Sequence, residues 1–269
     1  MKSMKRLGQY IPEFVLILTV MLIMFLGFWD IYFGAKAEAQ PHHHLHLATT
    51  FTWMGLLLFQ LVMIARPDYR QHRKIGLAVL VAAPLLVATT AMLSVHSAQK
   101  GVASGEGDFL IVQNVMVTIE LGVLISLAFL LKRRRKLHGA LLLSTTLLFM
   151  GIALFFALIS FAPPFRIEGP ETFYRFQTAG ITGQAICIAV GLALFLRDRR
   201  NGWPFLIAGA CFTLNDAIRG LLSKLGLIDP LTEFVGSLSQ PITFVAAFAL
   251  LGSFLAMTAL PTAGRPRPA

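Results

Sequence analysis

Residues 41–76 read PHHHLHLATTFTWMGLLLFQLVMIARPDYRQHRKIG, and this stretch decides the fold. A histidine cluster opens it, an apolar run over 46–65 follows, and a basic turn closes it. An apolar run of about 20 residues has the length that crosses a bilayer as a helix. The stretch therefore predicts one membrane-spanning helix with histidines at one end and cations at the other.

Apolar runs of similar length, separated by short polar connections, recur along all 269 residues. Backbone groups inside lipid must be satisfied within the protein, which leaves helices or closed barrels, and uninterrupted apolar runs exclude the alternating pattern of a barrel. The predicted fold class is an all-α integral membrane helical bundle. It is a single polytopic domain, 1–269, of about eight transmembrane helices: 12–34, 46–65, 75–95, 109–131, 138–161, 178–196, 203–223 and 233–259.

The composition agrees with a surface that faces lipid. Only 13% of the residues are charged, whereas soluble domains carry about 25%. The net charge of +10 comes from short clusters between the apolar runs, which is a topology pattern rather than a nucleic-acid-binding surface. The expected partners are the lipid bilayer and, at the basic loops, anionic headgroups.

The cations also predict orientation. With eight spans, 17 of the 23 Lys and Arg residues fall on one side, which places both termini in the cytoplasm of a multi-pass inner-membrane protein. Residues 35–37 resemble the small-residue cleavage site of a signal peptide. The apolar run before them is longer than the roughly 7–15 residues of a signal sequence, so we expect the first helix to be retained; cleavage would leave seven spans and an external N-terminus.

Two acidic side chains inside predicted spans are candidate functional groups, because an ionisable group in lipid is costly unless it is paired or faces a cavity. Glu120 lies near the middle of its span. Asp216 precedes Arg219 by three residues, a spacing that allows an ion pair on one helix. We expect Glu120 or Asp216 to serve as an acid–base or second-shell group. The alternative is that such groups only bond one helix to another.

Four of the seven histidines fall within residues 42–46. If the helix begins slightly before residue 46, His42 and His46 share one face, as do His43 and His46. His96, at the outer end of its span, can add a ligand, and three nitrogens with one carboxylate oxygen suit Zn, Cu or Fe. The candidate metal ligands are His42, His44, His46 and His96, the principal pair is His46 with His96, and the carboxylate comes from Asp30, Glu120 or Asp216. The alternative is a solvated histidine run that binds metal only adventitiously.

Haem b is the other cofactor that paired membrane histidines hold. His46 with His96 forms a possible outer axial pair, and His72 with His138 an inner one, an outline similar to that of cytochrome b561 proteins. His72 and His96 are 24 residues apart, or about 36 Å on one helix. That spacing favours one outer haem over two coupled ones. The inner histidines also suit contact with headgroups.

The chain resembles a family of uncharacterised bacterial multi-pass membrane proteins. The likeness rests on the His-x-His of His44 and His46, on Trp53 and Gln60, and on the His-Arg-Lys-Ile-Gly of residues 72–76. A second block combines Glu120 with a basic turn and His138, although residues 139–141 depart from the family pattern of a basic residue before Leu-Met. A third, around 198–202, is weaker. The resemblance covers about half the chain and implies a helical bundle with no assigned chemistry.

Three functions fit these features. The first is a metal- or haem-dependent membrane protein, a redox enzyme in its most specific form, with its site in the outer leaflet. The second is a transporter of a small solute, with Glu120 as the proton-coupling carboxylate. The third is a non-catalytic membrane scaffold.

Overall fold

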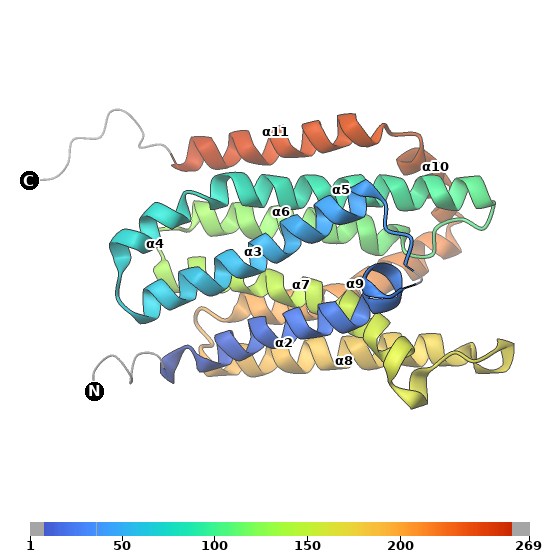
Figure 1. Ribbon diagram of the computed structural model, residues 1–269, viewed down its shortest axis with the longest axis horizontal. Coiled ribbons are helices and arrows are strands. Elements are labelled where there is room, and N and C mark those ends of the chain that lie inside the picture. Colours follow the sequence, from blue (N-terminus) through green and yellow to red (C-terminus); the bar gives the residue numbers. More distant parts are fainter. Residues whose placement is uncertain (1–7, 36, 260–269) are drawn as a thin grey trace, which may run out of the picture.

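The computed structural model describes residues 8–35 and 37–259, and over these residues it contains helices and no strand (Figure 1). The elements in chain order are α2 (Ile11–Gly27), η1 (Trp29–Phe33), α3 (Pro41–Ala65), α4 (Tyr69–Gly76), α5 (Val79–Ser104), α6 (Ile111–Leu130), α7 (Arg135–Phe161), η2 (Pro163–Phe165), η3 (Pro170–Thr172), α8 (Tyr174–Arg197), α9 (Trp203–Lys224), α10 (Ile228–Gly236) and α11 (Gln240–Ala259). The long helices run side by side as a bundle.

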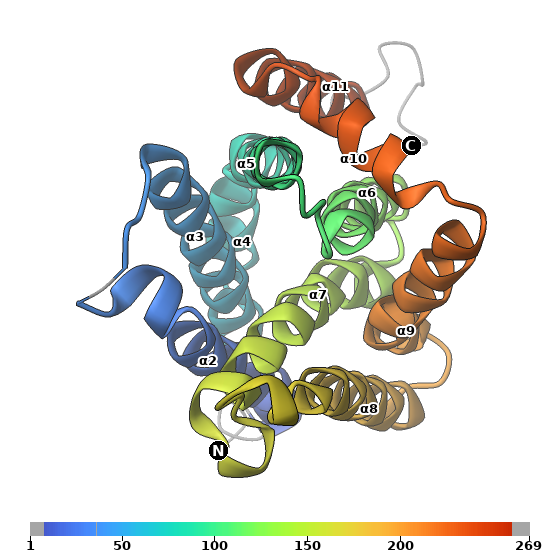
Figure 2. The same ribbon diagram turned by 90° about the vertical axis from the view of Figure 1, so that its right-hand side faces the viewer.

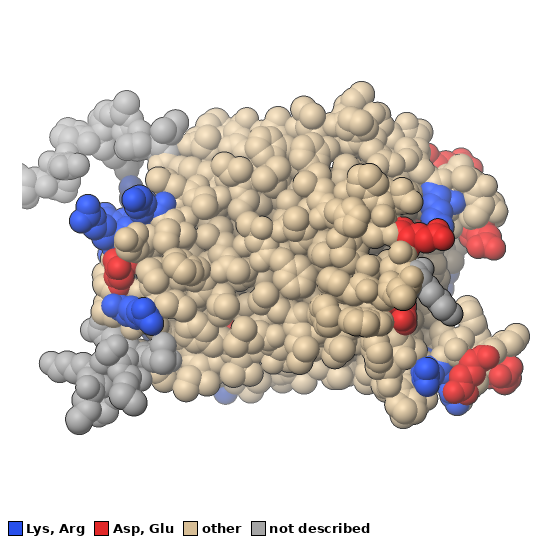
Figure 3. Space-filling view, viewed as in Figure 1, with Lys and Arg blue, Asp and Glu red and all other residues tan. Residues whose placement is uncertain are grey.

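Seven of the described helices are long and apolar enough to cross a membrane, namely α3, α5, α6, α7, α8, α9 and α11. α2 is apolar but has only 17 residues. Charged side chains gather at the two ends of the molecule, and the wide band between them is almost uncharged on the face shown in Figure 3. The chain is therefore a multi-pass membrane protein, as its hydropathy predicts.

Three predicted spans are interrupted where the sequence predicts continuous helices. The first, 12–34, is divided at Phe28 between α2 and η1. The third predicted span, 75–95, is divided between α4 and α5, and α5 continues to Ser104. α4 is a short basic helix whose N-cap, Asp68, accepts a hydrogen bond from the Gln71 N–H at 3.0 Å; this cap separates it from α3. The last predicted span, 233–259, is divided between α10 and α11.

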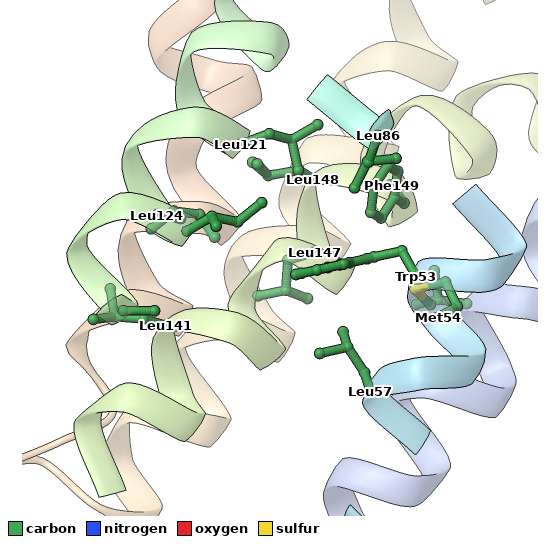
Figure 4. Close-up of a cluster of buried hydrophobic side chains, with 14 of the residues drawn as sticks. Trp53, Met54, Leu57, Leu86, Leu121, Leu124, Leu141, Leu147, Leu148 and Phe149 are labelled. Atoms are coloured by element: carbon green, nitrogen blue, oxygen red, sulfur yellow. The ribbon is translucent and has the colours of Figure 1, made fainter. Parts of the chain in front are cut away.

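α7 is the central helix of the bundle (Figure 2): it packs against α2, α6, α8 and α9, while α5 packs against α3, α6 and α11. The apolar core lies between these two groups, where Trp53 extends from α3 toward Leu147 of α7 (Figure 4). Trp53 is fully buried, and its indole N–H donates to Thr145 Oγ1 at 3.0 Å. This bond removes the cost of burying the indole nitrogen.

α8 and α9 are in close backbone contact through two glycines. A Cβ placed on Gly209 would lie 2.5 Å from the Cys187 carbonyl oxygen, and one placed on Gly191 would lie 2.5 Å from the Phe205 carbonyl oxygen. Small residues allow such an approach in membranes, where dispersion contacts rather than water exclusion hold helices together. The α8–α9 contact therefore depends on glycine at both positions.

Gly209→Ala should destabilise the protein by about 1–3 kcal/mol, because the added methyl forces α8 and α9 apart. Gly220→Ala on the same helix is the matched control: nothing lies within 4 Å of its Cβ position, so the change should be neutral or slightly stabilising. Thermal unfolding in detergent measures both. Equal melting temperatures for the two variants would contradict the close contact.

Candidate metal centre

The first turn of α3 positions the histidine cluster. α3 begins at Pro41, five residues earlier than the predicted start, so that all four clustered histidines lie on the helix. Proline is favoured at the first helical position because its missing N–H has no partner there anyway. Gln40 and His43 form a reciprocal capping box, in which the Gln40 N–H donates to His43 Nδ1 at 3.0 Å.

Three histidines converge at this end of the bundle. His42 and His43 of α3 meet His96 of α5, and one ligand nitrogen from each ring lies within 4.8 Å of the other two. The ring centroids are 4.0 Å apart for His42 and His96, 4.2 Å for His42 and His43, and 5.6 Å for His43 and His96. The contact between α3 and α5 therefore builds a three-histidine cluster, here called the triad.

The triad has the geometry to hold one metal ion. Zinc–nitrogen bonds of 2.0–2.1 Å at tetrahedral angles place ligand nitrogens about 3.4 Å apart, so the rings need only small rotations. His42 Nε2 is buried and has no hydrogen-bond partner. His43 is constrained, because its Nδ1 lone pair is occupied by the Gln40 N–H. Ligation by His43 must release that bond, at a cost of about 0.5–1.5 kcal/mol.

The other two clustered histidines make separate contacts. His44 Nδ1 and the Tyr32 hydroxyl are 2.5 Å apart, which joins α3 to η1. His46 lies deeper, with Nδ1 3.3 Å from Thr89 Oγ1 and Nε2 3.4 Å from Thr50 Oγ1. The triad includes neither of them, although sequence reasoning proposed both as ligands and His46 as the principal one.

His43 takes the third position in the triad, and sequence reasoning did not place it among the ligands. Residues 42 and 43 are adjacent and point about 100° apart on a helix, so the helical spacing rule does not pair them. Both are half-buried where α3 packs against α5, and both reach His96 there. Pro41 was the available signal, since proline marks the first helical residue.

None of the three candidate carboxylates belongs to the triad. Asp30 lies in η1, and Glu120 and Asp216 lie between α6, α8 and α9. Asp216 accepts hydrogen bonds from the amides of Gln113 and Gln184 and lies 3.5 Å from Arg219 Nε, so the predicted ion pair is present. Both Glu120 carboxylate oxygens are buried without a hydrogen-bond partner. Over the described residues, the triad contains no carboxylate. A fourth metal position would therefore be open to water or a solute.

The inner histidines have structural partners. In one orientation, both ends of the Gln60 amide are hydrogen-bonded. The oxygen accepts from the Gly76 N–H at 2.9 Å, and the NH2 group donates to His72 Nδ1 and to the His72 carbonyl. His138 Nδ1 lies 2.8 Å from the Ala128 carbonyl oxygen. The contacts of Gln60 with His72 and Gly76 thus hold α4 against α3.

No family model, curated protein or solved structure matches this chain. Its function must therefore be argued from the arrangement of its own residues.

Stability should fall as the pH drops below about 6.5. Burial, and then the neighbouring His138, hold the pKa of His72 below its ordinary value of 6.5. Between the lowered pKa and 6.5 the unfolded chain binds more protons at this position, so acid favours unfolding and neutral pH favours the fold. His72→Asn keeps an acceptor for Gln60 but does not titrate. Melting temperatures at pH 7.5 and 5.5 should differ less in this variant than in the wild type, and an unchanged difference would contradict a contribution from His72.

Proposed function

We propose that this chain is a multi-pass membrane protein that binds one transition-metal ion at its outer end through His42, His43 and His96. The carrying observation is that these three side chains, from two helices, bring ligand nitrogens to within 4.8 Å of one another. Three protein nitrogens with an open fourth position form the arrangement that metalloenzymes use, whereas structural zinc sites are closed by four protein ligands.

Metal-dependent redox chemistry at the outer leaflet is the function that we infer from this arrangement. Imidazole suits Zn, Cu and Fe, and of these Cu and Fe change oxidation state. Haem b is less well supported, because ring centroids 4.0–5.6 Å apart leave no space for a macrocycle between any two triad histidines. His46 is hydrogen-bonded to Thr50 of α3 and to Thr89 of α5. It would then hold together the two helices that carry the triad.

Purification with a histidine-free affinity tag should yield about one metal ion per chain by elemental analysis. Cobalt(II) added to stripped protein should give the strong visible bands of a four-coordinate site. His42→Ala, His43→Ala and His96→Ala should each weaken cobalt affinity by more than about tenfold, since even second-shell changes cost 10–100-fold. Cobalt affinity should also decrease as the pH is lowered, because ligand histidines must be neutral.

His44→Ala is the matched control, because His44 belongs to the same cluster but contacts Tyr32 instead. Its cobalt affinity should stay within about twofold of wild type. Equal losses in His44→Ala and His42→Ala would show adventitious binding to a histidine run. A Soret band that disappears in His46→Ala and His96→Ala would replace the metal proposal with a haem site.

We also propose the finer topology: eight spans in the inner membrane, with both termini cytoplasmic. α2 followed by η1 supplies the additional span, extending over residues 11–33. Two contacts support the placement of the termini at the basic end: Glu13 of α2 pairs with Arg197 at 2.7 Å, and Lys132 donates to the Thr258 carbonyl near the end of α11. This topology agrees with the family resemblance, which we retain as a proposal.

A fusion to the C-terminus distinguishes this topology from its alternatives. Green fluorescent protein, which folds in the cytoplasm, should fluoresce there, and alkaline phosphatase, which needs the periplasm, should be inactive. A fusion in the connection between α9 and α10, around Gly226, should show the opposite pattern. Active phosphatase at the C-terminus would contradict the proposed orientation.

A further inference from the structure

A second polar site lies halfway along the bundle, between α6 and α9. Glu120 is nine residues from the start of α6, and Asn215 is nine residues from the end of α9, so each lies about 14 Å from the outer end of its helix. This depth separates the site from the triad, which occupies the first turn of α3.

Four polar atoms at this site have no hydrogen-bond partner. They are the two carboxylate oxygens of Glu120 and the oxygen and nitrogen of the Asn215 carboxamide. Asn215 is completely buried. Leaving a buried polar group unsatisfied costs about 1–3 kcal/mol, and more when it is charged. Two adjacent groups of this kind therefore indicate a site that is completed by something else.

The two groups lie at the same depth on two helices that pack against each other. Asn215 and Cys211, one turn apart on α9, both neighbour the Glu120 carboxyl.

A proton is the ligand that satisfies all four atoms. A protonated carboxyl has one O–H donor and one carbonyl acceptor, and a carboxamide has the complementary N–H donor and carbonyl acceptor. We propose that Glu120 and Asn215 form an intramembrane proton-binding site, in which the Glu120 O–H donates to Asn215 Oδ1 and the Asn215 NH2 donates to the second Glu120 oxygen. Without the proton, Asn215 Oδ1 faces a carboxylate oxygen and the two acceptors repel.

The titratable and charged groups on the neighbouring helices do not replace the proton. Among the described residues of the helices packed on α6, Cys211 neighbours Glu120. Its thiol offers one weak S–H donor, which cannot satisfy the Asn215 carboxamide as well. Asp216 is bound by Gln113, Gln184 and Arg219. α11 carries no titratable side chain. The others lie toward the helix ends: His96 and Lys100 on α5, Arg135, Lys136 and His138 on α7, Lys224 on α9, and Asp229 and Glu233 on α10.

Protons reach this site from the outer side. Gln113, Asp216 and Gln184 form a hydrogen-bonded network on the outer side of Glu120, and Arg219 continues it to a surface pocket of about 290 Å³ beside Phe109 and Asp229. On the inner side, the buried residues are apolar: Leu121, Leu124, Ile125 and Ala128 on α6, and Phe205 and Ala208 on α9. The proton site needs no metal at the triad, so it goes beyond the proposed function.

Infrared spectroscopy of the protein in lipid nanodiscs at neutral pH tests the proposal. The expected signal is the carbonyl stretch of a protonated carboxylic acid, shifted in D2O. Glu120→Gln should abolish it while keeping a group that can pair with Asn215. Asp216→Asn is the matched control and should leave the band unchanged, because Asp216 is already paired. Asn215→Leu should move the band to higher frequency, since it removes the hydrogen bonds to the carbonyl.

Isotope labelling keeps the test decisive if a variant fails to fold. Wild-type protein labelled with 13C at the glutamate carboxyl should show the band at lower frequency, whereas labelling of the aspartate carboxyls should not move it. Absence of a protonated-acid band at neutral pH would overturn the proposal. So would a band that persists in folded Glu120→Gln or that shifts with the aspartate label alone.

Discussion

The structure depends on one constraint, the cost of leaving a polar group without a partner inside lipid. Helices satisfy the backbone at every residue between their ends, so the remaining cost falls on the few polar side chains and on the helix ends. On the face shown in Figure 3, the charged residues lie almost entirely at the two ends of the molecule. Inside the band, Trp53 bonds Thr145, and Asp216 bonds Gln113 and Gln184. In contrast to these paired groups, the polar side-chain atoms of Glu120 and Asn215 have no hydrogen-bond partner.

The same constraint explains where the histidine triad lies. The first N–H groups of α3 have no partner within the helix, and the Gln40–His43 capping box satisfies the helix start locally. His43 thus caps the start of α3 and also lies beside His42 and His96. While His43 Nδ1 accepts from the Gln40 N–H, the other ring nitrogen carries the proton, so a metal bound at either nitrogen would have to replace this capping bond. The start of α3 at Pro41, rather than composition alone, creates the site.

Hydropathy predicted the fold class, because length and apolarity alone determine whether a segment crosses lipid. It did not predict the breaks before α5 and α11, which depend on local turns and on packing at the membrane surface. The spacing of the histidines identified His42 and His96 as ligand candidates, and position within the apolar runs identified Glu120 and Asp216 as candidate acids. The sequence analysis paired His46 rather than His43 with His96, because spacing along one helix does not show which face of that helix contacts another helix. The Asn215 partner of Glu120 depends on the relative rotation of α6 and α9, which no single helical pattern contains.

The two proposed sites lie toward the same end of the bundle. The triad, Asp216 and the Glu120–Asn215 pair lie between the outer end and the middle of the bundle, and buried Leu, Ile, Phe and Ala side chains fill the space below Glu120. A conduction path needs polar lining across the whole bilayer, whereas the buried residues of α6 and α9 below Glu120 are apolar. Movement of a solute across this bundle would require the inner half to rearrange. The proposed metal at the triad and the proposed proton site would require no such change, so the arrangement agrees better with the proposed metal-dependent function than with a transporter.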